Sequence, residues 1–225
     1  GSASAVPAGE LFKLAGARLA PVAKRIYHLN FPTQYLLTST FLRFQERYES
    51  PKFHGKAFTL EEFMDWYATQ NGGKFTYFDD WAGFNLPSRI LRAFYRGEFD
   101  PLTRKERALL DLFRGLKGRF YIIGTFDEKT GKQTAETLRH EIAHGLFYTD
   151  ALYRREVKSI LAGLDLQPIF AWLGKNGYTE GSFFDEAHAY IGDDLKFLSK
   201  KGVDVAPYRE AHARLLALYR ARSGR

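Results

Sequence analysis

The segment from Thr137 to Tyr148 contains two histidines and a glutamate in the order His140-Glu141-x-x-His144. Positions four apart lie on one face of a helix, so His140 and His144 can point at one metal ion from consecutive turns. Glu141 lies about 100° further round the helix axis, where its carboxylate can reach a water molecule bound to that metal. Two imidazoles and an adjacent carboxylate are the groups that zinc-assisted peptide hydrolysis requires. The alternative is a helix whose histidines only satisfy neighbouring polar groups, and histidine is uncommon enough for us to prefer the metal site.

A catalytic zinc site needs a third protein ligand and one position that stays open for water. The chain has no cysteine, so this ligand must be a histidine or a carboxylate. Asp150 stands six residues after His144, where a third ligand occurs in sequences with glycine three residues after the second histidine, but here that residue is Phe147. We therefore prefer Glu186, which begins the E-x-x-A pattern of residues 186–189. The small residue one turn after the glutamate would allow its helix to approach the metal helix closely.

Other polar side chains near the ligand glutamate leave alternatives open. Asp185 would point about 100° away from the glutamate if both lie on a helix. His188 is an alternative ligand, an oxyanion donor or a histidine with structural contacts alone, and Tyr190 is a further alternative in the same segment. A ligand histidine usually needs an acceptor for its second ring N–H, and Asp193 and Asp194 are both candidates.

The two motifs together, H-E-x-x-H and the later E-x-x-A, resemble the gluzincin clan of zinc metallopeptidases. The wide gap between them is more similar to the anthrax lethal factor catalytic domain and its bacterial relatives than to thermolysin. The resemblance covers about residues 134–194. It implies a zincin-like core and one Zn²⁺ ion per chain, with the metal ligands His140, His144 and Glu186.

The same resemblance implies the roles of two further residues. In that group a tyrosine shortly before the ligand glutamate supports the developing oxyanion, which implies this role for Tyr178, with His188 and Tyr190 as alternatives. Glu141 would be the general base that accepts a proton from zinc-bound water and then delivers it to the leaving amine. We therefore expect a zinc-dependent metallopeptidase. The alternatives are a non-catalytic binding protein with a zincin fold, which would not need Glu141, and a zinc-dependent hydrolase of a non-peptide amide.

Composition constrains the partners and the compartment. The net charge of +7 favours acidic partners, but no segment resembles a nucleic-acid motif, so we expect a protein or peptide substrate and no nucleic acid. No apolar stretch is long enough to cross a bilayer, and we expect a monomer. Because Met64 is the only methionine, we expect that an upstream segment has been removed. The small residues 3–6 would suit the neighbourhood of a signal cleavage site, so a secreted, a periplasmic and a cytoplasmic protein all stay open.

The pattern of the whole chain predicts a mainly α (α+β) fold, with a helical N-terminal region over residues 1–115 packed on a zincin-like catalytic region over residues 116–225. We expect the two regions to form one compact unit. Residues 118–126 are the best strand, which we expect to form the upper wall of a substrate cleft and to pair with the substrate backbone. The aromatic segment 75–87 is expected to be a short strand or loop that packs in the core, rather than one that lines the cleft. Helices are predicted over residues 10–26, 33–48, 60–70, 88–95, 104–116, 134–148, 152–161, 166–175, 182–199 and 205–222, with capping boxes at Thr59 and Thr103.

Overall fold

The computed structural model describes residues 16–127 and 131–224. Helices predominate, and they are accompanied by one small sheet, which confirms the predicted mainly α (α+β) class. The chain divides into two compact units. The first contains Gly1–Pro21 and Tyr27–Gly131, and the second contains Val22–Ile26 and Lys132–Arg225. This division falls after Gly131, later than the boundary at residue 115 that the sequence predicts between its two regions.

The first described elements are strands, so the helix predicted over residues 10–26 is wrong from Arg18 onwards. β1 (Arg18–Ala23) and β2 (Ile26–Phe31) are joined by a two-residue turn, in which Arg25 takes a φ of 63°. Pro21 lacks the N–H group that a helix interior needs, and it is tolerated in β1 because this is an edge strand. Residues 10–15 of the predicted helix lie outside the described residues.

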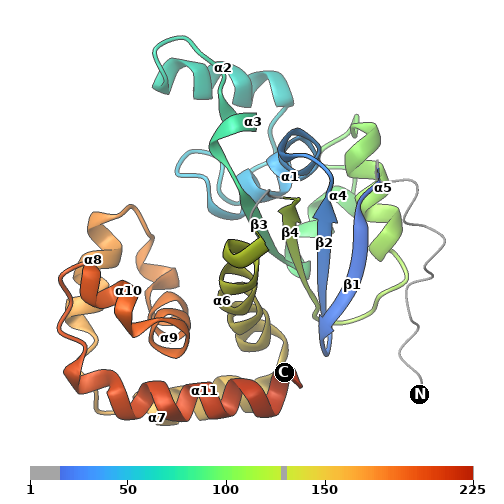
Figure 1. The fold of residues 1–225 in the computed structure, drawn as a ribbon. Helices are drawn as coiled ribbons and strands as arrows, with labels where there is room; N and C mark the ends of the chain where they lie inside the picture. Colours follow the sequence, from blue (N-terminus) through green and yellow to red (C-terminus); the bar gives the residue numbers. More distant parts are fainter. Residues whose placement is uncertain (1–15, 128–130, 225) are drawn as a thin grey trace. The chain divides into compact units, whose positions relative to one another are not determined.

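The sheet has the strand order β1-β2-β4-β3 (Figure 1). β3 (Gly83–Pro87) runs antiparallel to β4 (Tyr121–Phe126), with Gly83 opposite Thr125. β4 is the strand that the sequence predicts before the metal helix. Because β4 is hydrogen-bonded to a neighbouring strand on each side, it has no free edge, and the prediction that it pairs with a substrate backbone is wrong.

The helix α1 (Gln34–Glu49) packs against β3 and β4 and begins at the predicted cap, Thr33. Phe41 on this helix stacks on Phe84 of β3, with ring centroids 5.4 Å apart. Gly124 of β4 permits this close approach, because a Cβ atom at that position would lie 2.8 Å from the side chain of Leu37. The helix and the sheet therefore meet at a contact that only glycine allows.

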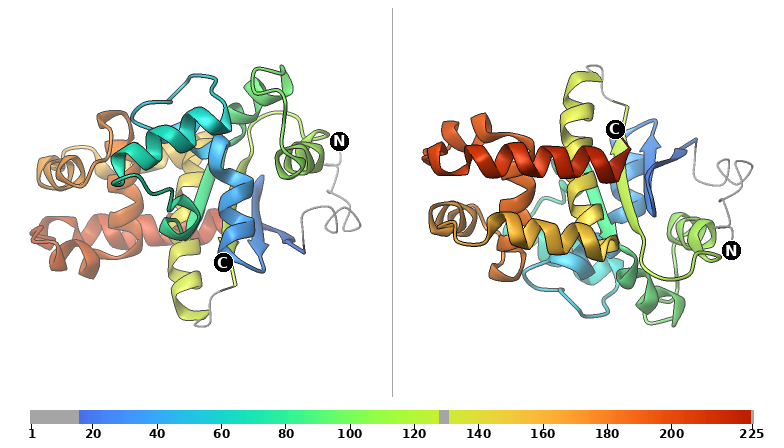
Figure 2. Two further views of the ribbon diagram at one scale, coloured as in Figure 1. Left: turned by 90° about the horizontal axis from the view of Figure 1, so that it is seen from above. Right: turned by 90° about the horizontal axis from the view of Figure 1, so that it is seen from below.

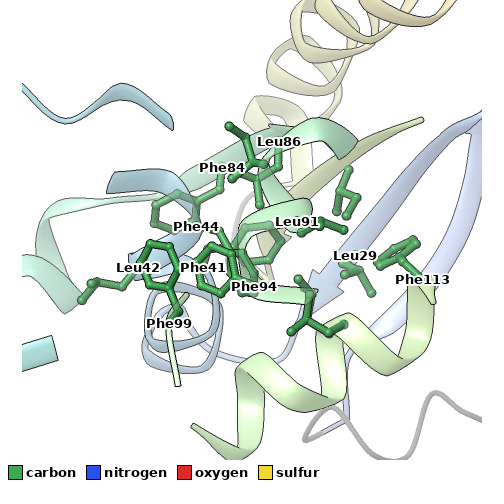
Figure 3. Packing of buried hydrophobic residues seen from close by; sticks show 14 of the residues in the cluster. Leu29, Phe41, Leu42, Phe44, Phe84, Leu86, Leu91, Phe94, Phe99 and Phe113 are labelled. Carbon is green, nitrogen blue, oxygen red and sulfur yellow. The ribbon is translucent and has the colours of Figure 1, made fainter. Parts of the chain in front are cut away.

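Phenylalanine dominates the core of the first unit (Figure 3). Phe94 lies between two other rings, with its centroid 4.0 Å from that of Phe44 and 3.9 Å from that of Phe99. Short helices pack around this cluster: α2 (Leu60–Gln70), α3 (Tyr77–Asp80), α4 (Leu91–Tyr95) and α5 (Arg104–Phe113).

Two sequence predictions about these segments are confirmed. Thr59 and Thr103 form the predicted capping boxes at the starts of α2 and α5. The aromatic segment 75–87 packs in the core through Tyr77, which is completely buried, and Phe84, which is 3% exposed, while Trp81 is 40% exposed. The segment forms α3 and then β3, so it combines a short helix with the predicted strand.

The second unit consists mainly of helices. Its longest helices are α6 (Gly131–Thr149) and α11 (Arg209–Ser223). α11 packs along α7 (Ala151–Leu161) and α9 (Phe183–Asp193), while α8 (Gln167–Lys175) and α10 (Leu195–Lys200) also pack on α9 (Figures 1 and 2).

The single helix predicted over residues 182–199 is two helices, α9 and α10. Asp194 leaves the helical conformation between them, with a φ of −146° and a ψ of 88°. Its carboxylate then caps α10 by accepting hydrogen bonds from the backbone N–H groups of Lys196 at 2.9 Å and Phe197 at 3.1 Å. Among the helices of the described residues, none combines the length and the apolar character that crossing a membrane requires.

Candidate metal centre

α6 presents His140 and His144 from consecutive turns, as the four-residue spacing predicts. The Nε2 atoms of the two rings lie 3.1 Å apart. His144 is buried and His140 is half-buried. The predicted cap, Thr134, is an internal residue of α6, because the helix begins three residues earlier at Gly131.

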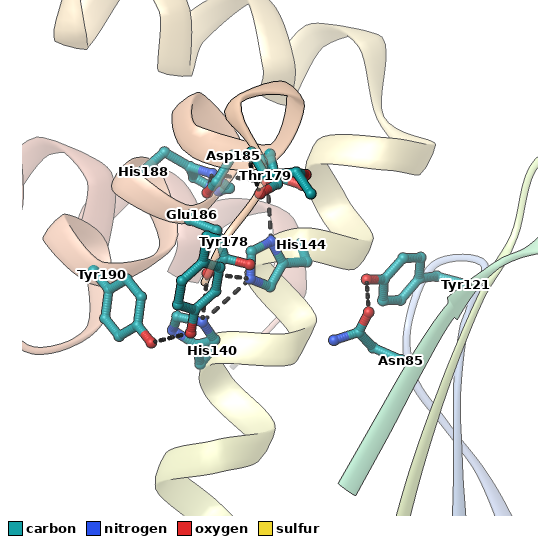
Figure 4. A network of polar contacts seen from close by, with 11 residues as sticks. Asn85, Tyr121, His140, His144, Tyr178, Thr179, Asp185, Glu186, His188 and Tyr190 are labelled. Atoms are coloured by element: carbon teal, nitrogen blue, oxygen red, sulfur yellow. Dashed lines mark hydrogen bonds and ion pairs between the residues drawn. The ribbon is translucent and has the colours of Figure 1, made fainter. Parts of the chain in front are cut away.

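Glu186 reaches the same point from α9 (Figure 4). Its Oε2 atom lies 3.7 Å from His140 Nε2 and 3.6 Å from His144 Nε2. Ala189, the small residue of the E-x-x-A pattern, is completely buried. The three side chains that the sequence analysis selected as ligands are thus brought together by two helices that are far apart in the sequence.

The distances between these three donor atoms match those around a zinc ion. Donors about 2.0–2.1 Å from zinc at tetrahedral angles are separated from one another by about 3.3–3.4 Å. The observed separations of 3.1, 3.6 and 3.7 Å lie on both sides of that value. Two imidazoles and one carboxylate are also a donor set found in hydrolytic zinc sites. The residues therefore fit zinc in both their chemistry and their spacing.

The charges at the site favour a cation. Burial by itself lowers the pKa of His144, but the negative charges of Asp185 and Glu186 outweigh this effect and hold that pKa well above its ordinary value. Burial raises the pKa of Glu186, but the charge of His144 outweighs it and lowers the pKa to about 2. The same balance lowers the pKa of Asp185. Both carboxylates are therefore ionised at neutral pH, and a positive charge among them is stabilised, whether it is a proton on His144 or a metal ion.

Asp185 is the residue that the sequence analysis missed as a partner of a ligand histidine. Its Oδ1 atom lies 3.0 Å from His144 Nδ1, the ring nitrogen that does not face Glu186. A carboxylate in this position orients an imidazole and favours the tautomer whose other nitrogen can bind a metal. Since adjacent helical residues point about 100° apart, the neighbour of a ligand cannot reach the same metal but can reach the ring of a second ligand.

The two acceptors that the sequence analysis named have other partners. The Asp193 carboxylate pairs with the guanidinium of Arg139. Asp194 caps α10. The prediction that one of them supports a ligand histidine is therefore replaced, for His144, by Asp185.

Two tyrosines lie beside the converging donors. The hydroxyl oxygens of Tyr178 and Tyr190 are 3.0 Å apart, and the Tyr190 ring centroid is 4.6 Å from that of His140. Burial raises the pKa of both phenols, so both keep their protons at neutral pH and can donate hydrogen bonds. The negative charges of Glu186 and Glu141 raise the pKa of both phenols further. The structure thus brings Tyr178 and Tyr190 to one site and leaves either able to contact an oxyanion.

Glu141 and Asp150 occupy different surroundings. Glu141 lies within the H-E-x-x-H motif, and Asp150 lies six residues after its second histidine. Glu141 is half-buried on α6, directly after His140. Asp150 instead caps α7, where its carboxylate accepts hydrogen bonds from the N–H groups of Leu152 at 2.9 Å and Tyr153 at 3.1 Å. Asp150 therefore has a structural task, which agrees with its rejection as a third ligand.

His188 is not one of the converging donors. Its ring is 1% exposed, and its Nδ1 atom faces the backbone oxygen of Asp185 at 2.5 Å. The ligand set of His140, His144 and Glu186 does not include it. Of the alternatives for His188, the interpretation as a ligand therefore has no support among the converging donors.

Comparison of the chain with models of protein families, with curated proteins and with solved structures finds no match. The resemblance of the two motifs to the gluzincin clan stays a prediction.

Proposed function

We propose that this protein is a zinc-dependent metallopeptidase. The main support is the convergence of His140 Nε2, His144 Nε2 and Glu186 Oε2 within 3.1–3.7 Å of one another, with Glu141 next in the chain to the first ligand. Zinc held by these atoms would supply a Lewis acid that polarises a peptide carbonyl and makes water more acidic. One ion per chain is expected, because the three donors form one site.

Glu141 is the proposed general base. Its carboxylate accepts a proton from the attacking water as the oxygen forms its bond to the peptide carbonyl carbon. The same group then gives this proton to the amide nitrogen as the C–N bond breaks, so Glu141 ends each turnover ionised. Its place next to His140 on α6 keeps it beside the metal ligands without being one of them.

Tyr178 and Tyr190 are the proposed oxyanion donors. Their phenols are protonated at neutral pH, because burial raises the pKa of each. A hydrogen bond from such a group becomes stronger as negative charge grows on the carbonyl oxygen, and this differential stabilisation lowers the barrier. The hydrogen bond between the two hydroxyls holds them in place for this contact.

The test combines zinc analysis with cleavage of a mixed peptide library. The zinc-reconstituted protein should hold one zinc ion per chain and cleave a subset of the peptides. Glu141→Gln should keep the zinc and lose about 10²–10⁴-fold in cleavage rate, because it removes the base and leaves the ligands intact. Glu180→Gln is the matched control, since Glu180 is an exposed carboxylate of the same unit.

Each result bears on one part of the proposal. Equal turnover by Glu141→Gln would refute the assigned base. A protein that is metal-free as purified and indifferent to added zinc would refute the metal centre. Stoichiometric zinc with no cleavage of any library peptide would favour the non-catalytic binding protein or the hydrolase of a non-peptide amide.

A further inference from the structure

His188 is a buried polar side chain close to the proposed metal ligands. It lies on α9 two residues after Glu186 and is 1% exposed. Its Nδ1 atom is 2.5 Å from the backbone oxygen of Asp185. A carbonyl oxygen can only accept a hydrogen bond, so Nδ1 of His188 carries the proton.

The same ring nitrogen also lies within ion-pair distance of the side chain of Asp185. The distance from His188 Nδ1 to Asp185 Oδ1 is 3.1 Å. That oxygen is also 3.0 Å from Nδ1 of His144 (Figure 4). One carboxylate oxygen of Asp185 therefore lies between two imidazoles, one of which is a proposed metal ligand.

The neighbouring rings hold the imidazole of His188 in a fixed orientation. It stacks on Phe147 of α6 with a centroid distance of 4.8 Å and an interplanar angle of 26°. Tyr153 of α7 meets it edge-on at 5.9 Å. These contacts direct Nδ1 at Asp185. Among the described residues, neither Nε2 of His188 nor Oδ1 of Asp185 has a partner in hydrogen-bond geometry, so Oδ1 is held by close polar contacts at 3.0 and 3.1 Å.

We propose that His188 is a positioning residue of the metal centre. Its Nδ1–H holds the Asp185 carboxylate where it faces His144 Nδ1, and Asp185 in turn keeps the Nε2 lone pair of His144 directed at the ligand position. The inference rests on the proposed function, since it assigns His188 to the same zinc site. Residues that orient a metal ligand in this way typically change metal affinity by about 10–100-fold when they are replaced.

A histidine with a purely structural role would make the same ring contacts without affecting metal binding. The variants must therefore distinguish the effect of ring packing from the effect of the N–H group at Nδ1. His188→Phe keeps a flat ring against Phe147 and Tyr153 but has no N–H. His188→Asn loses the ring, yet its amide nitrogen is separated from Cα by the same number of bonds as Nδ1 and can donate to Asp185.

The experiment measures zinc affinity of the full chain by competition with a chromophoric chelator. His188→Phe should bind zinc about 10–100-fold more weakly than the wild type. His188→Asn should stay close to the wild type. Cobalt substitution gives a second readout, because the visible absorption of a Co²⁺ site reports the arrangement of its ligands and should change in His188→Phe alone. Thermal unfolding of the metal-free variants checks that each is folded.

The outcomes distinguish this inference from the proposed function. If the wild type binds zinc and a folded His188→Phe binds it equally well, the positioning role is overturned and the zinc site stands. Equal weakening in His188→Phe and His188→Asn would also overturn it, since packing would then explain both losses. A wild type that binds no zinc would overturn the proposed function and this inference together.

Should His188→Phe fail to fold, His188→Gln replaces it. The glutamine amide lies one bond further from Cα than that of asparagine and cannot occupy the Nδ1 position. Weaker zinc binding by His188→Gln than by His188→Asn would then support the positioning role, and equal binding by the two would overturn it.

Discussion

Both units contain ionised side chains that are partly or fully removed from solvent, but they pair these charges differently. In the first unit Arg43 and Glu106 are almost completely buried and form a two-point ion pair, with Nε to Oε1 at 2.6 Å and Nη2 to Oε2 at 2.5 Å. Arg43 also donates to the backbone oxygen of Pro101 at 3.2 Å, and Glu106 accepts from the N–H of Thr103 at 2.8 Å. The charges cancel within the pair, and the fork of the guanidinium matches the carboxylate.

In the second unit the buried charges do not close on one another. Asp185 and Glu186 are two carboxylates on adjacent residues, and they share the single ring of His144. Three donor atoms, from His140, His144 and Glu186, converge at separations of 3.1–3.7 Å. A closed buried pair satisfies its own charges, whereas a convergent set with excess negative charge favours a cation, which is the basis of the proposed zinc site.

The largest effect is expected when the cluster of His140, His144 and Glu186 loses its carboxylate donor. Glu186→Ala should abolish stoichiometric zinc binding, because two imidazoles alone do not make a stable site. Elemental analysis of the dialysed, zinc-reconstituted variant measures this loss. Glu180→Ala, at an exposed carboxylate of the same unit, should keep full occupancy. Full zinc occupancy in Glu186→Ala would place the third ligand elsewhere and remove the contrast between the two clusters.

Substitutions in the buried ion pair of Arg43 and Glu106 should change the free energy of unfolding and leave metal binding unchanged. Arg43→Met leaves Glu106 buried without its partner and should cost about 3–5 kcal/mol in the free energy of unfolding, measured by chemical denaturation. Replacing both partners, as Arg43→Met with Glu106→Leu, should recover much of that loss. Arg114→Ala breaks an exposed ion pair with Asp111 and should cost at most about 1 kcal/mol. A loss of stability in Arg43→Met as small as in this control would show that burial does not determine how much the ion pair contributes to the free energy of unfolding.

A smaller effect is expected from the residue that orients a ligand. Asp185→Asn should weaken zinc binding by about 10–100-fold while the protein stays folded, because the amide no longer supplies a charged acceptor to His144 Nδ1. Competition with a chelator measures the affinity. Asp193→Asn is the matched comparison, since Asp193 pairs with Arg139 and not with His144, and its zinc affinity should equal that of the wild type. The reverse order of these two affinities would contradict the assignment of Asp185.

The smallest effects are expected at helix caps, where the two units should behave alike. Thr59→Ala at α2 and Asp150→Ala at α7 should each cost about 1 kcal/mol in the free energy of unfolding, because each removes an acceptor for backbone N–H groups. Thr59→Ser should restore the first cap. Asp150→Ala should also leave zinc affinity unchanged, and a loss of metal in that variant would revive Asp150 as a ligand.

Local spacing alone determined the parts of this protein that lie within one helix. The pairing of His140 with His144 follows from the pitch of a helix, and so does the exclusion of Asp150 as a ligand once no glycine is available to turn the chain. The capping boxes at Thr59 and Thr103 were predictable for the same reason, since their hydrogen bonds span three residues. Glu186 could be selected as a candidate ligand because its pattern offered a carboxylate and a small residue one turn apart.

Only the tertiary structure decided what depends on contacts between distant segments. The strand at residues 121–126 could be predicted from its β-branched residues, but its place inside the sheet depends on which strands pair with its edges. Residues 18–26, the first part of the hairpin at residues 18–31, were predicted to be helical because their apolar residues also fit a helical period, and pairing along the sheet settles that ambiguity. The chain from His188 through Asp185 to His144 depends on the rotation of α9 about its axis, which packing fixes and the spacing of residues along one segment does not encode.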